Sequence, residues 1–206
     1  MRHLTKPNLV IASTTLLWAI GVALGLRMLL TYENTPGATG EAPSTWPTAS
    51  KLHLEPKGKT LLMFAHPRCP CTVASVEELA QIMAHCQGQL HAYVLLWKPG
   101  DASADWEKTK LSADAAHIPG VTVLSDAQGG EAQRFGAATS GDVLLFDSSG
   151  RRLFHGGITG SRGHAGDNAG AEAVVAFVRG AARTPSSSLV FGCSLSGRPK
   201  TRGPGS

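Results

Sequence analysis

Two cysteines separated by one proline, Cys69-Pro70-Cys71, lie between a short apolar run and an amphipathic segment. The run at residues 60–65 (TLLMFA) predicts a buried strand that ends just before the cysteines. Residues 70–85 predict a helix with one buried face, because apolar side chains recur at the i, i+3 and i+4 spacing: Val73, Val76, Leu79, Ala80 and Met83. A cysteine pair at the junction of a buried strand and a helix favours an α/β fold.

The rest of the chain continues this alternation. Strands are expected at residues 90–97 (LHAYVLLW) and 121–124, and helices at 104–116, 130–135 and 171–178. Residues 142–147 (DVLLFD), the turn 148–150 and residues 151–158 (RRLFHGGI) predict a β-hairpin. The 206 residues suffice for one domain with extensions.

An uncharged apolar run covers residues 9–26, and it resumes after Arg27. Its length predicts a helix that crosses a membrane, while Arg2 and Lys6 before it keep the N-terminus cytoplasmic by the positive-inside rule. The alternative is a cleaved signal peptide. Either way the domain works outside the cytoplasm, where disulfides persist. We expect a single-pass protein of the inner (cytoplasmic) membrane, with its domain facing the periplasm or the exterior.

The chain divides by composition into five parts. Residues rich in Pro, Thr, Ser, Ala and Gly follow the apolar run, and residues rich in Ser, Gly, Arg and Pro end the chain. We predict a cytoplasmic N-terminus (1–8), a transmembrane signal anchor (9–30), a flexible linker (31–50), the folded domain (51–183) and a largely disordered tail carrying Cys193 (184–206).

Charge and motifs exclude several classes of protein. The net charge of +4 reflects basic residues at the two ends of the chain: Arg2, Lys6, Arg198, Lys200 and Arg202. No basic face is left to bind nucleic acid. Neither a nucleophile elbow nor a P-loop supports hydrolysis or nucleotide binding.

Cys69 is the predicted nucleophile of the pair. We expect Cys69 to be the N-cap of the helix, with Pro70 as its first residue, where a missing N–H has no cost. A thiolate at this cap accepts orphan N–H groups and faces the positive end of the helix dipole, so its pKa falls. Arg68 and His66 are expected to add positive charge beside an exposed sulfur.

The sequence leaves the partner of Cys69 open. A bond to Cys71 is possible but strained, because the two Cα atoms approach only to the upper edge of the disulfide range and Pro70 stiffens the path. Cys193 is the other resolving partner, since its tail is long enough to fold back over the motif. Cys86 lies at the far end of the predicted helix, about 22 Å from Cys71, and is predicted to be a buried or incidental thiol.

The order of elements resembles thioredoxin: a central mixed sheet flanked by helices. Three stretches (AHPRCPCTVAS, FGAATSGDVLLFDSSGRRLFHGGITGSRGHAGDN and VFGCSL) are similar to the thioredoxin-like proteins known as RedB, over roughly residues 60–195. This resemblance implies a thioredoxin fold carrying a redox-active Cys-Pro-Cys.

That topology predicts two loops beside the cysteines, 139–141 and 159–168. Thioredoxins usually have a Thr followed by a cis-proline at the first loop, where the cis-proline docks a substrate peptide and keeps metals away. Ser140 and Gly141 stand there instead, which raises the case for metal binding or a narrower partner. In the second loop, Arg162 and His164 are candidates to stabilise a thiolate or move its proton. The alternative is a turn-forming loop whose Asp167 or Asn168 caps the last helix.

Three functions are compatible with these residues. The leading prediction is a thiol-disulfide oxidoreductase, without a cofactor beyond its own disulfide, that acts on a protein or small-molecule thiol or disulfide. Cys69 would attack a partner disulfide, and Cys71 or else Cys193 would resolve the mixed disulfide. The second is a copper(I) or zinc protein, with Cys69 and Cys71 joined by further ligands. Those ligands would come from His66, His164 and Cys193. The third is a structural domain in which Cys71 or Cys69 is bridged permanently to Cys193.

Overall fold

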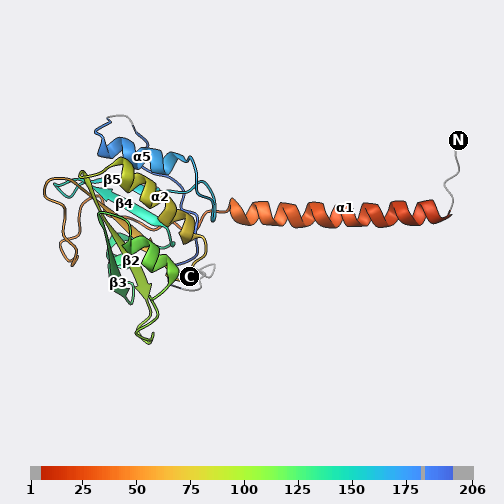
Figure 1. Ribbon diagram of the computed structural model, residues 1–206, viewed down its shortest axis with the longest axis horizontal. Coiled ribbons are helices and arrows are strands. Elements are labelled where there is room, and N and C mark those ends of the chain that lie inside the picture. The colour runs from red at the N-terminus through yellow and green to blue at the C-terminus, as the bar shows by residue number, and fades with distance from the viewer. Residues whose placement is uncertain (1–5, 182–183, 197–206) are drawn as a thin grey trace, which may run out of the picture. The chain divides into compact units, whose positions relative to one another are not determined.

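A computed structural model describes residues 6–181 and 184–196 of the chain (Figure 1). The chain forms two compact units that divide after Thr35. The first unit is an N-terminal helix, and the second is an α/β domain.

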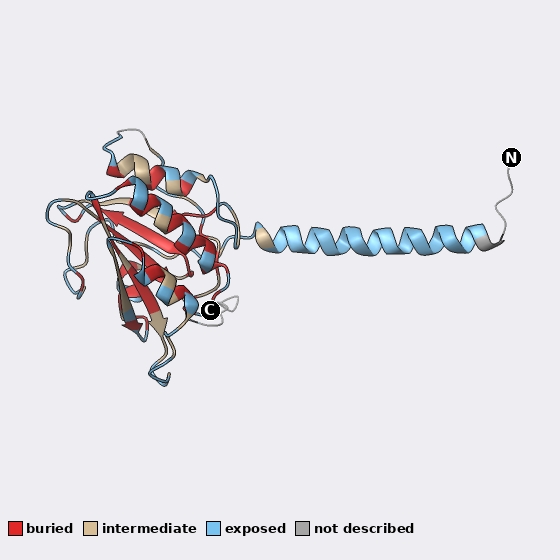
Figure 2. Cartoon of the chain, in the orientation of Figure 1, coloured by how far each residue is buried: buried red, intermediate tan, exposed pale blue. Residues whose placement is uncertain are grey.

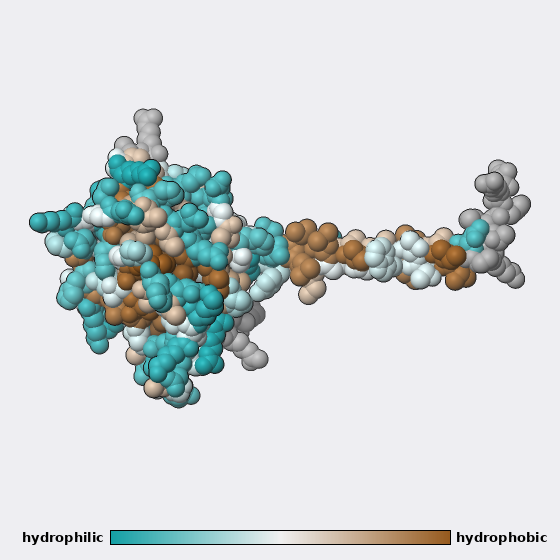
Figure 3. Space-filling model, in the orientation of Figure 1, coloured by the Kyte–Doolittle hydropathy of each residue, from teal (hydrophilic) through white to brown (hydrophobic). Residues whose placement is uncertain are grey.

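Helix α1 (Lys6–Glu33) is the apolar segment expected at residues 9–30. Its side chains are almost all exposed (Figure 2), and apolar groups run along its surface (Figure 3). The hydroxyls of Ser13 and Thr14 both donate to the Val10 carbonyl, so these polar groups are satisfied within the helix. Residues 8–33 are long and apolar enough to cross a membrane, a criterion that a signal sequence also meets.

The second unit has a five-stranded mixed sheet in the order β3-β2-β1-β4-β5. The strands are β1 (Lys59–Ala65), β2 (Leu90–Lys98), β3 (Val121–Ala127), β4 (Asp142–Phe146) and β5 (Arg152–Gly157). Central strand β1 pairs parallel with β2 and antiparallel with β4, and β4 and β5 form the predicted hairpin. The predicted thioredoxin-like fold is confirmed.

Helices cover both faces of this sheet. They are α2 (Thr72–His85), α3 (Lys110–Ala116), α4 (Gly130–Phe135) and α5 (Ala169–Val178). Leu79, Val94 and Val174 belong to the apolar core shared by α2, α3 and α5. Phe64 and Phe135 belong to a second core on the face that α4 covers. Strand β1 contributes alternate side chains to both cores and is therefore buried, as its uninterrupted apolar sequence predicts.

Helix α3 begins later than residue 104, where the sequence predicts it. Thr109 is its N-cap and forms a capping box with Ser112, so the helix begins at Lys110. The preceding residues form turns, and Trp106 among them donates from its ring N–H to the Trp97 carbonyl at 3.2 Å. That side chain is thereby held against the sheet instead of continuing a helical face.

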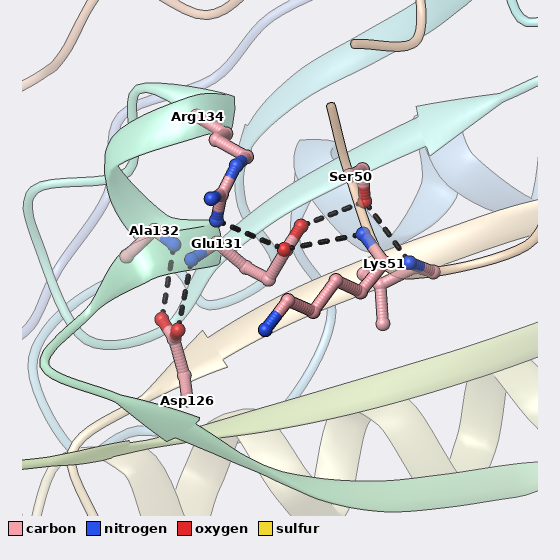
Figure 4. A network of polar contacts seen from close by, with 7 residues as sticks. Ser50, Lys51, Asp126, Glu131, Ala132 and Arg134 are labelled. Atoms are coloured by element: carbon pink, nitrogen blue, oxygen red, sulfur yellow. Dashed lines mark hydrogen bonds and ion pairs between the residues drawn. The ribbon is translucent and has the colours of Figure 1, made fainter. Parts of the chain in front are cut away.

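Residues 36–50 differ from the expected flexible linker, because they pack against the domain. The Trp46 ring lies edge-on to Phe135 and Phe146, each at 5.1 Å between centroids. Ser50 donates to the Glu131 carboxylate at 2.7 Å in the network of Figure 4. The Asp126 carboxylate in the same network accepts the first N–H groups of α4. Long-range contacts therefore order a segment whose composition alone predicts a tether.

Residues 184–196 likewise differ from the largely disordered tail that composition predicts. His155 of edge strand β5 donates its N–H to the Ser186 carbonyl at 3.0 Å, and Ser187 forms a parallel bridge with His155. Val190 and Leu195 are buried at 1% and 3% exposure. The segment thus satisfies an open sheet edge and buries two apolar side chains. The predicted tail residues 197–206 lie outside the described part of the chain.

Candidate functional site

Three chain segments meet at one edge of the sheet because of the strand register. Phe64, near the end of β1, pairs with Asp142 at the start of β4, and Asp142 pairs with Gly157 at the end of β5. The Cys69-Cys71 motif follows β1, loop 139–141 precedes β4, and loop 159–168 follows β5. The predicted meeting of the motif with loop 139–141 is confirmed by the bond from the His66 N–H to the Ser140 hydroxyl, 2.8 Å long.

The cysteine motif forms a tight turn before helix α2. Thr72 donates its N–H to the Cys69 carbonyl at 3.2 Å, and Val73 donates to the Pro70 carbonyl at 3.3 Å. Cys71, with helical backbone angles, is the N-cap, and α2 begins at Thr72. The prediction of Cys69 as N-cap and Pro70 as first helical residue is therefore wrong. These i to i+3 bonds place a turn of 3₁₀ type ahead of the helix.

Cys193 lies beside the motif although it is 124 positions away from Cys69 in the sequence. The Sγ atoms of Cys69 and Cys193 share a hydrogen bond 2.8 Å long. The sulfurs of Cys69, Cys71 and Cys193 all lie within 4.8 Å of one another. All three are free thiols in the structure. These three cysteines form the candidate site.

Backbone pairing with loop 139–141 holds Cys193 in this place. Ser140 donates its N–H to the Cys193 carbonyl at 2.7 Å, and Leu195 donates to the Ala138 carbonyl at 3.0 Å. Thr139 and Ser194 form an antiparallel bridge. The tail therefore takes, along this loop, the kind of extended pairing by which a strand is added to a sheet edge.

Two hydroxyls lie beneath the site. The Oγ1 of Thr72 and the Oγ of Ser140 are 2.6 Å apart, and both residues are fully buried. Thr72 also hydrogen-bonds the Cys69 sulfur. The sequence reasoning missed Thr72, although a hydroxyl residue directly after the motif, at the start of the helix, was a visible signal. Gly141 follows with a φ of 92°, and a Cβ there would lie 2.9 Å from the Ser75 hydroxyl, so this turn requires glycine.

The surroundings separate the pKa values of the three thiols. Burial acts to raise the pKa of Cys69, but hydrogen bonds from Cys193, from the Thr72 hydroxyl and from the backbone N–H groups of Cys193 and Cys71 outweigh burial and lower it. Burial and the charge of Cys69 raise the pKa of Cys71. Burial, the hydrogen bond to Cys69 and the neighbouring thiolates raise the pKa of Cys193 to about 12. Cys69 is therefore the sulfur that ionises first.

The expected exposure of the Cys69 sulfur is wrong. Cys69 is 3% exposed and Cys71 is 7% exposed, whereas Cys193 is partly exposed. The physical reason is the tail, which the sequence predicts as disordered and which covers the motif.

Arg162 approaches the site and His164 does not join it. The Arg162 guanidinium donates to the carbonyl of Gly192, next to Cys193, and its charge acts to lower the pKa values of Cys71 and Cys193. His164 is exposed, and its Nδ1 lies 2.9 Å from the Arg162 carbonyl. Asn168 caps α5 by accepting the Ala171 N–H at 2.8 Å, as the alternative interpretation of this loop predicts.

His66 belongs to an aromatic group beside the motif. Its ring stacks on Trp97 at 5.5 Å between centroids, and the Arg68 guanidinium lies 4.0 Å above the Trp106 ring. Burial and then the Arg68 charge lower the pKa of His66, so it is neutral at physiological pH. Among the described residues, neither His66 nor His164 has a ring nitrogen in the cluster of three sulfurs.

Cys86 is separate from the site, as predicted. It is the C-cap of α2, at the opposite end of that helix from the motif, and it is 1% exposed within the apolar core. Burial raises the pKa of its thiol, which keeps it protonated and unreactive.

The fold and the site together define a thioredoxin-like domain with three neighbouring cysteines. No protein-family model and no curated protein sequence matches the chain. A solved hypothetical protein from Sinorhizobium meliloti is similar, with a TM-score of 0.58 and 22% identity over 79% of this chain and 94% of that one. An uncharacterized conserved protein from Geobacillus kaustophilus is similar with a TM-score of 0.57 and 17% identity, over 81% and 94% of the two chains.

A more distant likeness is to a secreted disulfide oxidoreductase of Mycobacterium tuberculosis. Its TM-score is 0.37 with 18% identity, over 47% of this chain and 66% of that one. The first two structures share the fold over nearly their whole length. At sequence identities this low, the similarity shows a shared fold and nothing about activity.

Proposed function

We propose that the chain is a thiol-disulfide oxidoreductase whose redox couple is Cys69 and Cys193. The distance of 2.8 Å between their Sγ atoms carries this proposal, because the two sulfurs need only a small approach to form a disulfide when an oxidised partner takes their two electrons and two protons. In the oxidised form the couple takes two electrons and two protons from a partner dithiol, which leaves as a disulfide. The resemblance of residues 60–195 to RedB-type proteins points the same way.

The assignment of Cys193 rather than Cys71 as partner of Cys69 follows from the geometry of the chain. A bond between Cys69 and Cys71 would have to span one proline within the turn that precedes α2, which is unfavourable for disulfide geometry. The tail instead presents Cys193 through backbone hydrogen bonds on both sides of its sulfur. Arg162 supports the reaction by placing positive charge near the developing thiolates.

Equilibration in glutathione buffers of different ratios tests this function. The full chain in detergent micelles is expected to gain or lose two free thiols per molecule as the buffer changes. Cys69→Ser and Cys193→Ser should each abolish the change without unfolding the domain. An unchanged thiol count in the unsubstituted chain would refute the proposed function.

We further propose that α1 anchors the domain outside the cytoplasm. Its length and apolar surface support an uncleaved anchor, and the basic residues before it support a cytoplasmic N-terminus. Extraction of native membranes with alkaline carbonate is expected to leave the chain in the membrane, with a mass that still includes α1. A shorter chain released into the soluble fraction would indicate a cleaved signal peptide.

A second candidate function is binding of a soft metal ion. The three sulfurs within 4.8 Å of one another favour copper(I), which thiolates select. Zinc is disfavoured because it takes four ligands in structural sites, and no fourth ligand from His66 or His164 joins this cluster. Titration of the reduced chain with copper(I) against a competing chelator separates the two functions. One tightly bound ion per chain, lost in Cys193→Ser, would favour the metal.

A further inference from the structure

The three sulfurs of the site differ in how far a partner can reach them. Cys69 and Cys71 are 3% and 7% exposed, and only Cys193 of the three is partly exposed. A disulfide between Cys69 and Cys193 therefore joins a buried residue to a partly exposed one.

The tail is fixed on both sides of Cys193. Before it, Val190 is buried, and its carbonyl accepts the Gly37 N–H at 2.8 Å. After it, Leu195 is buried, and its N–H donates to the Ala138 carbonyl at 3.0 Å. Cys193 is thus fixed between two buried, hydrogen-bonded residues of the tail, Val190 and Leu195.

The contact between the tail and loop 139–141 is also close. A Cβ on Gly192 would lie only 1.9 Å from the Ser140 carbonyl oxygen. This approach is possible only for glycine, so the tail and the loop touch along their backbones. A partner peptide cannot pair with the same backbone groups of loop 139–141 while the tail is in place.

Thiolate attack on a disulfide is in-line, so the attacking sulfur approaches opposite the leaving sulfur. Attack on Cys193 Sγ comes from the side away from Cys69, and Cys193 is the partly exposed residue of the two. Attack on Cys69 Sγ would come from the side away from Cys193, but Cys69 is only 3% exposed in all, and the Thr72 hydroxyl hydrogen-bonds its sulfur.

We infer that, in the oxidised protein, a partner thiolate attacks the Sγ atom of Cys193 and Cys69 is the leaving group. This inference rests on the proposed function, and it specifies which sulfur of the couple contacts the partner. It selects partners whose thiol reaches a surface sulfur without strand pairing to loop 139–141: a small thiol or a cysteine on an exposed loop.

The exchange balances in two steps. The partner thiolate forms a bond to Cys193 Sγ, the bond between Cys193 and Cys69 breaks, and Cys69 leaves as a thiolate. A second partner thiolate then attacks the partner sulfur of the mixed disulfide. The partner leaves as a disulfide, Cys193 leaves as a thiolate, and the two cysteines of the protein end reduced by two electrons.

Mapping of the trapped mixed disulfide tests this order. The oxidised full chain in detergent micelles is mixed briefly with glutathione, quenched with acid, denatured and blocked with N-ethylmaleimide. Peptide mass spectrometry then locates the glutathione and the maleimide. We expect glutathione on Cys193 in at least about tenfold excess over Cys69, because access controls which sulfur is attacked.

A pair of glycine variants tests the role of the tail. Gly192→Ala forces the tail away from Ser140, so glutathione should appear on Cys69 as well. Gly160→Ala is the matched control, since a Cβ there meets only the Asn168 Cβ at 3.9 Å, and its adducts should match those of the unsubstituted chain.

Two outcomes would overturn the inference, and they are distinguishable. Glutathione mainly on Cys69 or Cys71, in a chain whose thiol count still responds to glutathione buffers, overturns the order of attack and leaves the proposed function standing. A thiol count that never changes refutes the proposed function and this inference with it.

Discussion

A disulfide between Cys69 and Cys193 is expected to stabilise the folded chain by about 5 kcal/mol at most. The two residues are 124 positions apart, so the cross-link removes the freedom of a long loop from the unfolded state. In chain-entropy terms a loop of this length contributes about 5 kcal/mol, whereas the very short loop of a Cys69–Cys71 bond contributes roughly 1.6 kcal/mol. Hydrogen bonds to the Cys69 thiolate stabilise the reduced form and decrease this gain, so we expect about 2 to 5 kcal/mol.

Equilibrium unfolding in urea measures this gain. The full chain in detergent micelles is unfolded in its oxidised form and after reduction with a phosphine, and tryptophan fluorescence follows the loss of packing around Trp46, Trp97 and Trp106. Cys193→Ser should remove the difference in free energy of unfolding between the two forms, and Cys71→Ser should retain it. Equal stabilities of the oxidised and reduced chain, or a difference that is lost in Cys71→Ser and kept in Cys193→Ser, would refute the reasoning.

Three further substitutions test the site and its support. Thr72→Val removes a hydrogen bond to the Cys69 sulfur and should raise the pKa of that thiol, seen as thiolate absorbance in the ultraviolet. The pKa of the Cys69 thiol is lower in the folded than in the unfolded chain, so it stabilises the folded reduced chain at pH values above the unfolded pKa, and this contribution is lost as pH falls through the folded pKa. Thr72→Val should therefore lose more stability in alkaline than in acidic buffer. An equal loss at both pH values would contradict this role of Thr72. Trp46→Ala should cost about 3 kcal/mol in thermal or urea unfolding, and the exposed control Leu189→Ala less than about 0.5 kcal/mol; equal effects would mean that residues 36–50 are not packed. Asn168→Ala should cost about 1 kcal/mol through loss of the α5 cap, and an unchanged melting temperature would contradict that role.

The sheet and the position of the motif could be predicted because their signals are local. The apolar run at 60–65, the helical period that follows it and the hairpin at 142–158 each specify their element from neighbouring residues. The order of elements then brings the ends of β1 and β5 and the start of β4 to one edge of the sheet. These steps use only propensity, period and topology.

The packing of the two segments at the ends of the domain could not be predicted, because the residues that they contact are distant from them in the sequence. Residues 36–50 and 184–196 are rich in Gly, Pro, Ser and Thr, and their apolar residues follow no helical or strand period. A few buried or packed apolar side chains hold these segments against the domain: Trp46 in the first segment, and Val190 and Leu195 in the second. Their partners lie on β5, on α4 and in loop 139–141, so only the folded domain shows where they pack.

The same limit explains the errors at the motif itself. Helical period alone does not distinguish a helix that begins at Pro70 from a turn followed by a helix at Thr72. The burial of Cys69 depends on the tail, and so does the hydrogen bond that lowers its pKa. The sequence does offer Cys193 as a possible partner, because its tail is long enough to fold back, and the structure places its sulfur 2.8 Å from that of Cys69.

Disulfide mapping of the full chain after equilibration with oxidised glutathione shows which two cysteines form the redox couple. Thiols are blocked in acid, and the peptides that remain joined are identified by mass spectrometry. We expect one joined pair, the Cys69 peptide with the Cys193 peptide, while Cys71 and Cys86 carry the blocking group. A bond between Cys69 and Cys71, or four blocked thiols under every condition, would contradict it.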